Sequence, residues 1–281
     1  MSMPPLPVTT VPPETRGFRL RAAGPLPAPV VAHARRSAEP VPRVAVLLLH
    51  GFTGSPQSIR PWGEYLAAHG FDVTCPRLPG HGTVWQEMVP TRWSDWYTRA
   101  EQEWYRASAD HDVVLVAGLS MGGALAIRLA QRHPGLAGVA LVNPAIASAD
   151  PAYRFALPVL SRVLTSIAGV AGDIARPDRL EVGYDRTPLR AAASMVEAWR
   201  TIAAELSSYT PPTIIFRSDV DHVVDESGAA LLASESPAPL TVRPLARSYH
   251  VATLDWDAEA IFADSVAFWV GVLTGREPVY R

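Results

Sequence analysis

The chain has 281 residues, of which 48% are hydrophobic and 19% charged, a balance typical of a globular protein with a large core and not of a disordered chain. All 25 basic residues are arginines, and with 27 acidic residues they leave a formal net charge of −2. The longest basic run is the pair Arg35 and Arg36. Because the chain lacks a basic patch in its sequence, we expect no nucleic-acid partner.

A single cysteine, Cys75, excludes an internal disulfide and a multi-thiolate metal site. The longest strongly apolar run, residues 44–49, is far too short to span a membrane. The first residues lack the basic start and apolar stretch of a secretory signal. We therefore expect a soluble, cytoplasmic protein without a membrane span.

The N-terminal region is rich in proline. Ten of the 27 prolines lie in the first 42 residues, where they fix φ and remove hydrogen-bond donors. Residues 1–16 are therefore predicted to be an extended or mobile arm. Short alternating stretches at 17–22 and 29–34 indicate early edge strands.

From residue 44 the pattern changes to apolar runs that alternate with helical periodicity. In chain order, strands are expected over 44–49, 71–75, 113–117 and 138–142, and helices over 59–69, 93–104 and 124–133. Continuous apolar runs indicate strands covered on both faces. Alternation of such strands with helices predicts a mostly parallel α/β sheet flanked by helices.

The alternation stops between residues 144 and 208, where only helix-like segments at 155–170 and 189–206 are apparent. Strands resume at 213–217 and 240–245, and a helix over 258–273 closes the chain. We therefore expect a core formed by 17–143 and 209–281, with 144–208 inserted as a small helical cap. Such a cap would cover the carboxyl edge of the sheet, where ligands bind in open α/β folds.

The motif Gly118-Leu119-Ser120-Met121-Gly122 lies between an apolar strand and an apolar helix. This strand-turn-helix setting indicates a nucleophile elbow, in which a tight turn projects the hydroxyl of Ser120. Glycines are needed at 118 and 122 because side chains there would strike neighbouring backbone. Ser120 is therefore the candidate nucleophile.

A serine nucleophile needs a hydrogen-bonded base that a carboxylate orients. The loop after strand 240–245 supplies His250, and the loop after strand 213–217 supplies Asp219 and Asp221, which this pattern alone leaves open. His50 and His81 border glycine turns and are expected to brace loops. No H-x-x-x-H or H-x-E pair occurs, so we expect no metal site.

Two backbone donors are needed for the developing oxyanion. The N–H of Met121 follows the nucleophile directly, and the loop His50-Gly51-Phe52 offers the N–H of Phe52.

The blocks HGFTGSPQSIRPWGEYLAAHGFDVTCPRLPGHG, GLSMGG, DHVVD and SYHVATLD resemble those of the α/β-hydrolase superfamily, within it the bacterial carboxylesterase and monoacylglycerol lipase group. The resemblance implies Asp221 as the acid and His250 of S-x-H-V as the base, with Phe52 and Met121 in the oxyanion hole. It further implies hydrolysis of small-molecule esters, either short- to medium-chain acyl esters or monoacylglycerols, with a small cap and no cofactor. The oligomeric state stays open.

Other chemistry uses the same framework: a thioesterase, C–C hydrolase, serine peptidase or acyltransferase would carry these residues too. A non-catalytic ligand-binding protein on this scaffold is the alternative from another class. The apolar cap residues 155–160, 163 and 164 could line an acyl pocket or pack the cap on the sheet, and the sequence leaves both readings open.

Overall fold

The computed structural model describes residues 10–169, 171–277 and 280. Within this part of the chain a seven-stranded sheet has the order β1-β3-β2-β4-β5-β8-β9. Neighbouring strands are parallel, except that β1 is antiparallel to β3. The strands are β1 (Phe18–Leu20), β2 (Val44–Leu49), β3 (Asp72–Cys75), β4 (Val113–Leu119), β5 (Gly138–Val142), β6 (Ser166–Ala168), β7 (Arg186–Pro188), β8 (Thr213–Ser218) and β9 (Leu240–Leu245).

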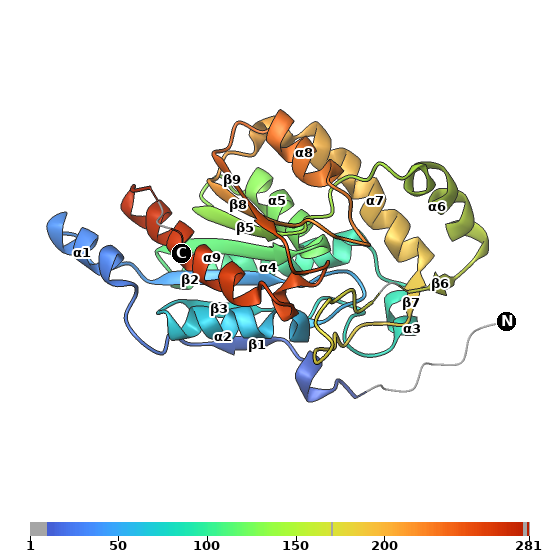
Figure 1. Ribbon diagram of the computed structural model, residues 1–281, viewed down its shortest axis with the longest axis horizontal. Helices are drawn as coiled ribbons and strands as arrows, with labels where there is room; N and C mark the ends of the chain where they lie inside the picture. The colour runs from blue at the N-terminus through green and yellow to red at the C-terminus, as the bar shows by residue number, and fades with distance from the viewer. Residues whose placement is uncertain (1–9, 170, 278–279, 281) are drawn as a thin grey trace.

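Helices connect these strands and cover the sheet (Figure 1). The α-helices are α1 (Ala28–Arg36), α2 (Arg60–Ala68), α3 (Trp85–Met88), α4 (Trp93–Asp110), α5 (Met121–Arg132), α6 (Pro151–Val163), α7 (Leu189–Ala204), α8 (Ser227–Glu235) and α9 (Ala258–Thr274). Short 3₁₀ helices are η1 (Pro13–Thr15), η2 (Pro56–Ile59), η3 (Leu206–Ser208) and η4 (Ala252–Leu254). The predicted mostly parallel sheet flanked by helices is therefore confirmed.

Burial of the central strands explains their continuous apolar sequence. Every residue of β2 and of β5 is buried. On one face of the sheet, Trp62 of α2 and Trp269 of α9 pack into one cluster. On the other face, Trp96 of α4 and Leu125 of α5 pack into another. A strand covered on both faces has no polar side, so its sequence shows no alternation.

Two expectations for the N-terminal region need correction: the edge strand at 29–34, and an extended or mobile arm that continues to residue 16. The stretch 17–22 contains the edge strand β1, but 29–34 lies in helix α1 and not in a strand. Proline is favoured in the first turn of a helix, where its missing N–H is not needed, and Pro29 lies there. At the end of the predicted arm, Thr15 is buried and its hydroxyl donates to the carbonyl of Gly82. The arm's first nine residues lie outside the described part.

The segment 144–208, here called the cap segment, contains α6, β6, β7 and α7. In Figure 1, α6, β6 and β7 lie at the right of the molecule, and α1 extends from its left end. The expectation of helices alone was wrong, because β6 and β7 pair antiparallel. Three-residue strands are too short to show a period. The helix expected over 155–170 instead ends at Val163; position 170 lies outside the described residues.

No helix in the described part of the chain is long and apolar enough to cross a membrane.

Candidate active site

Ser120 occupies the sharp turn between β4 and α5. Its φ is 56° and its ψ is −117°, a conformation that L residues rarely adopt and that glycine tolerates. The N–H of Ser120 donates to the carbonyl of Val142, and its carbonyl accepts from Gly123. These bonds hold the strained turn in place, and α5 begins at once with Met121. The strand, sharp turn and helix expected around Ser120 are therefore present, and its role as nucleophile stays a prediction.

The two glycines of the motif are required by close backbone contact. A Cβ at Gly118 would clash with the backbone of Gly122, and a Cβ at Gly122 would clash with the backbone carbonyl of Leu49. Because backbone atoms cannot move aside as a flexible side chain can, no other residue fits either position without rearrangement. The sequence argument for these glycines is thus supported by the packing.

His250 follows β9 and is hydrogen-bonded to Asp221, which follows β8. Nδ1 of His250 lies 2.8 Å from Oδ2 of Asp221. Both side chains are buried, with 8% and 7% of their surfaces exposed. The second oxygen, Oδ1, accepts the N–H groups of Val223 and Val224 at 2.8 Å. Asp221 is thereby fixed on both sides and can hold the imidazole in one orientation.

The pKa of Asp221 is lowered. Burial opposes its ionisation, but the hydrogen bond from His250, the charge of that ring and the N–H groups of Val224 and Val223 outweigh burial. Asp219, the carboxylate that the sequence left open beside Asp221, is exposed. Geometry therefore favours Asp221 as the partner of His250.

Ser120 and His250 line the same cavity, but no hydrogen bond between the Ser120 hydroxyl and the His250 ring occurs among the described residues. Such contacts are often long in ligand-free enzymes and shorten when substrate binds. Asn143, which the sequence analysis missed, links the loop that carries His250 to Ser218 at the end of β8, shortly before Asp221. Its side-chain amide donates to the His250 carbonyl at 2.9 Å and to the Ser218 hydroxyl at 3.0 Å.

Of the two predicted backbone donors, Phe52 lines the cavity, and Met121 directly follows Ser120, which lines it. Met121 is the first residue of α5, so its N–H has no acceptor within the helix. Phe52 lines the cavity, and a Cβ at the preceding Gly51 would be 3.4 Å from Cβ of Ser120. The loop therefore approaches the nucleophile closely.

His50 orients that loop. The N–H of Leu78 donates to Nε2 of His50 at 3.2 Å, so the proton is on Nδ1, which donates to the carbonyl of Gly51 at 3.0 Å. Carbonyl and N–H of one trans peptide point in opposite directions, and the N–H of Phe52 therefore points away from His50. Burial and the charge of Arg77 lower the pKa of His50 to about 4, although the bond to Gly51 favours protonation.

His81 packs edge-on against His50, with ring centroids 5.0 Å apart, and its Nδ1 lies 3.0 Å from the carbonyl of Pro79. Both histidines are completely buried. The expectation that they brace loops agrees with these contacts.

The cavity has a volume of about 340 Å³ and a mostly apolar lining. From the cap segment it is lined by residues of α6, β6 and α7: Ala156, Leu157, Leu160, Ile167, Leu189, Ala192, Met195 and Trp199. Helix α6 has apolar residues on its outer side as well, because Phe155, Val159 and Val163 are 65%, 60% and 75% exposed. Part of the apolar stretch 155–164 thus lines the cavity, and part faces outward.

Polar groups in the cavity wall are few. Glu181 from the cap segment lines it together with Thr53, and the carboxylate accepts the N–H of Gly172 at 3.0 Å. Burial raises the pKa of Glu181, although Gly172 and His250 oppose the shift. No group of three or more metal-binding side chains occurs among the residues that the structure describes. Glu181 was not singled out from the sequence, where it lies in a segment without a motif.

The family described as serine aminopeptidase, S33 matches residues 40–257. A thermostable monoacylglycerol lipase from Bacillus sp. (strain H-257) is 35% identical over 227 residues, which cover 80% of this chain and 90% of that protein. A carboxylesterase from Bacillus subtilis (strain 168) is 26% identical over 227 residues, covering 80% of this chain and 91% of its own.

Solved structures agree with these relatives. A structure from a study of two metagenome-derived lipolytic enzymes, LipS and LipT, has a TM-score of 0.81 and 31% identity, covering 92% of this chain and 98% of that one. A monoacylglycerol lipase from Paleococcus ferrophilus has a TM-score of 0.72 and 19% identity, covering 91% and 98%. The α/β-hydrolase fold predicted from the sequence is confirmed.

Proposed function

This chain belongs to the serine aminopeptidase S33 family of hydrolases, and on that premise we propose that it is a serine esterase that cleaves short- to medium-chain acyl esters or monoacylglycerols. One observation carries the proposal. His250, hydrogen-bonded to Asp221, lines the same apolar cavity as Ser120, whose backbone is held in a strained turn. A serine with a strained backbone and a histidine base that line one cavity are typical of an activated nucleophile.

The reaction proceeds through an acyl-enzyme. Ser120 Oγ attacks the ester carbonyl while Nε2 of His250 takes the hydroxyl proton and then gives it to the leaving alcohol. Asp221 accepts the Nδ1 hydrogen bond, which keeps Nε2 free to act as the base. The N–H groups of Phe52 and Met121 stabilise the negative oxygen. Water then repeats the sequence and releases the acid.

The cavity lining supports an acyl substrate with a polar alcohol. Leu157, Leu160 and Met195 offer an apolar wall for the acyl chain. Glu181 and Thr53 offer hydrogen-bonding groups in the same cavity, which suit the free hydroxyls of a glycerol leaving group. The relatives named as monoacylglycerol lipase and carboxylesterase agree with this substrate class.

The test is a series of p-nitrophenyl esters from two to sixteen carbons with monoacylglycerols of matched chain length, assayed with the wild type and Ser120→Ala. We expect turnover with a chain-length optimum and a loss on the order of 10⁶ in kcat for Ser120→Ala. Melting of both proteins controls for folding. Absence of turnover on every ester, or an unaffected Ser120→Ala, would overturn the proposal.

A second candidate, aminopeptidase activity, is favoured by one observation. Glu181 places a carboxylate in the cavity, where it could pair with the ammonium group of a peptide N-terminus. Aminoacyl p-nitroanilides in the same series separate the two, because an aminopeptidase would cleave them faster than acyl esters and would lose that preference in Glu181→Gln.

The cytoplasmic location stays a prediction, as does the absence of nucleic-acid partners.

A further inference from the structure

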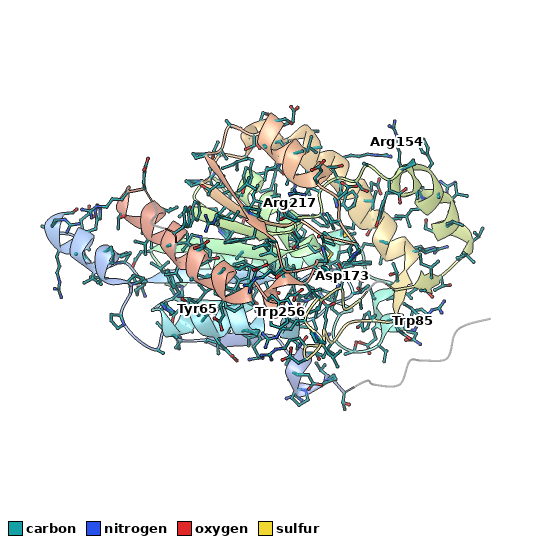
Figure 2. All side chains as sticks on the ribbon, viewed as in Figure 1. Tyr65, Trp85, Arg154, Asp173, Arg217 and Trp256 are labelled. Carbon is teal, nitrogen blue, oxygen red and sulfur yellow. The ribbon has the colours of Figure 1, made fainter. Side chains whose placement is uncertain are left out.

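A short part of the cap segment, residues 173–176, lies against the loop that carries His250. We call 173–176 the strap and 249–256 the histidine loop. The guanidinium of Arg176 lies over the ring of Trp256, 5.0 Å from its centroid. Figure 2 labels Asp173 and Trp256 near the middle of the molecule, well away from α6, where Arg154 is labelled. The strap is therefore a part of the cap segment that contacts the histidine loop.

Asp173 binds both loops that carry the pair of His250 and Asp221. Its Oδ2 accepts the N–H of His250 at 3.1 Å and the N–H of His222 at 3.2 Å. Its Oδ1 lies 2.8 Å from Nδ1 of His222. The carbonyl of Asp173 also accepts the N–H of Val251 at 3.0 Å. One residue of the strap thus joins the backbone at the base to the backbone next to the acid.

Asp255 of the histidine loop makes the reciprocal contacts. Its side chain accepts the N–H groups of Ala175 at 2.7 Å, Arg176 at 3.0 Å and Tyr249 at 2.9 Å. Asp255 is only 1% exposed, and no arginine or histidine forms an ion pair with it in the described part of the chain. A buried carboxylate is costly unless hydrogen bonds satisfy it, so the strap is held firmly to the histidine loop.

These hydrogen bonds help to set the distance between the imidazole of His250 and the carboxylate of Asp221. His222 is the residue after Asp221, and His250 carries the imidazole, so Asp173 fixes the main chain at both ends of the 2.8 Å hydrogen bond. Its side chain is 13% exposed, whereas that of His222 is 56% exposed, so the bond to the His250 N–H is the better shielded of the two. Displacement of a catalytic group by about 1 Å can lower a rate by about 10²-fold. A carboxylate that holds both loops therefore controls the geometry on which proton transfer depends.

We propose that Asp173 is a positioning residue: it sets the place of the His250 imidazole relative to Asp221 and Ser120 and thereby makes the cap segment part of the catalytic framework. This inference rests on the proposed function. Asp173 touches neither substrate nor the reacting atoms, and it acts through the backbone of His250 and His222.

The test compares Asp173→Ala and Asp173→Asn with Asp178→Asn as the matched control. Asp178 lies just after the strap, its side chain is 60% exposed, and it pairs with Arg176. The control therefore removes the same charge beside the strap and includes any disturbance through Arg176 and Trp256, while every hydrogen bond of Asp173 stays in place. Three measurements are made: kcat and KM on the best ester, the rate of Ser120 labelling by a fluorophosphonate, and the downfield proton resonance of the bond between His250 and Asp221.

We expect Asp173→Ala to lose about 10²-fold in kcat and in labelling rate with little change in KM. Its downfield resonance should shift or broaden, and Asp173→Asn, which keeps one accepting oxygen, should lose less. Asp178→Asn should match the wild type in all three measurements. If Asp173→Ala does not fold, the decision rests on Asp173→Asn.

Equal kcat, labelling and resonance in Asp173→Asn and Asp178→Asn would overturn the inference while leaving the esterase intact. An inactive wild type, or an active Ser120→Ala, would overturn the proposed function instead. The downfield resonance is measured without any substrate, so the two failures are distinguishable.

Discussion

The two walls of the cavity are built differently. The core wall carries Ser120 and His250, and it is held by a strained turn, glycines in backbone contact and buried hydrogen bonds. The cap wall is formed by α6, β6 and α7. Helix α6 packs against α7 and leaves Val159 and Val163 exposed on its outer side. A wall fixed by backbone geometry tolerates few substitutions, whereas a wall fixed by apolar packing tolerates many. We therefore expect few substitutions to be tolerated in the core wall. The preference for acyl-chain length should change more readily, through substitutions in the cap wall.

The largest effect is expected at the acid of the core wall. Asp221→Asn should lower kcat by about 10⁴-fold, because an amide no longer holds the imidazole in the tautomer that accepts a proton. Asp219→Asn is the control, since Asp219 is the exposed carboxylate two residues earlier. Ester hydrolysis by the two variants decides the assignment. A larger loss in Asp219→Asn would reverse it.

Loss of a backbone donor should be the next largest effect. Phe52→Pro removes the N–H proposed to bind the oxyanion, and the expected loss in kcat is about 10²- to 10³-fold. Phe52→Ala changes the side chain and keeps the donor, so its kcat should stay within a few-fold of the wild type. If both substitutions had the same effect, the side chain and not the N–H would be responsible.

Lowering the pH should reduce the free energy of unfolding of the protein, because His50 and His81 are buried and resist protonation in the folded state. The folded pKa of His50 is about 4, below the ordinary value of about 6.5. Between these values the unfolded chain binds a proton that the native ring does not, so stability falls as pH drops through this window and levels off below it. For His50 the loss amounts to about 3 kcal/mol. His81, whose pKa burial also lowers, acts in the same direction.

Urea unfolding of the wild type and His50→Gln at pH 7, 5.5 and 4 measures this dependence. The variant should be less stable at pH 7 but should lose less stability on acidification. Parallel curves would show that His50 does not contribute.

The smallest effect is expected at the cap wall. Leu157→Trp fills part of the cavity and should lower kcat/KM for long-chain esters by about tenfold while leaving the acetyl ester unchanged. Val159→Trp places the same side chain on the exposed side of α6 and should leave the chain-length profile as it was. Rates across the ester series distinguish the two. Equal profiles would remove α6 from the acyl site.

The contrast between the core wall, fixed by local backbone geometry, and the cap wall, fixed by packing, also explains which features could be predicted from the sequence. Ser120 and its glycines form a local motif between recognisable elements, and the order of the strands then located His250 and the loop that holds Asp219 and Asp221. The choice of Asp221 came from the resemblance to the α/β-hydrolases. The linking residues Asn143, Asp173 and Asp255 could not be found this way, because each makes a hydrogen bond to a distant part of the chain, across 107, 77 and 80 residues respectively. Its place directly after the buried strand β5 is the one local signal that could have drawn attention to Asn143.

In the cap segment, local patterns were insufficient. Strands β6 and β7 have three residues each, and their pairing depends on bringing together segments that are 20 residues apart. The stretch 29–34 was predicted as a strand but begins with Pro29. Proline weakens a strand and is favoured in the first turn of a helix, where Pro29 lies in α1.

The conformation of Ser120 has a consequence for heat resistance. A residue with a side chain at φ 56° and ψ −117° costs of order 1–3 kcal/mol that glycine would avoid. Ser120→Gly should therefore melt above Ser120→Ala, since only the first variant removes the Cβ from the turn. The protein should be more thermostable with glycine at position 120 than with the proposed nucleophile, so selection for heat tolerance alone would act against Ser120.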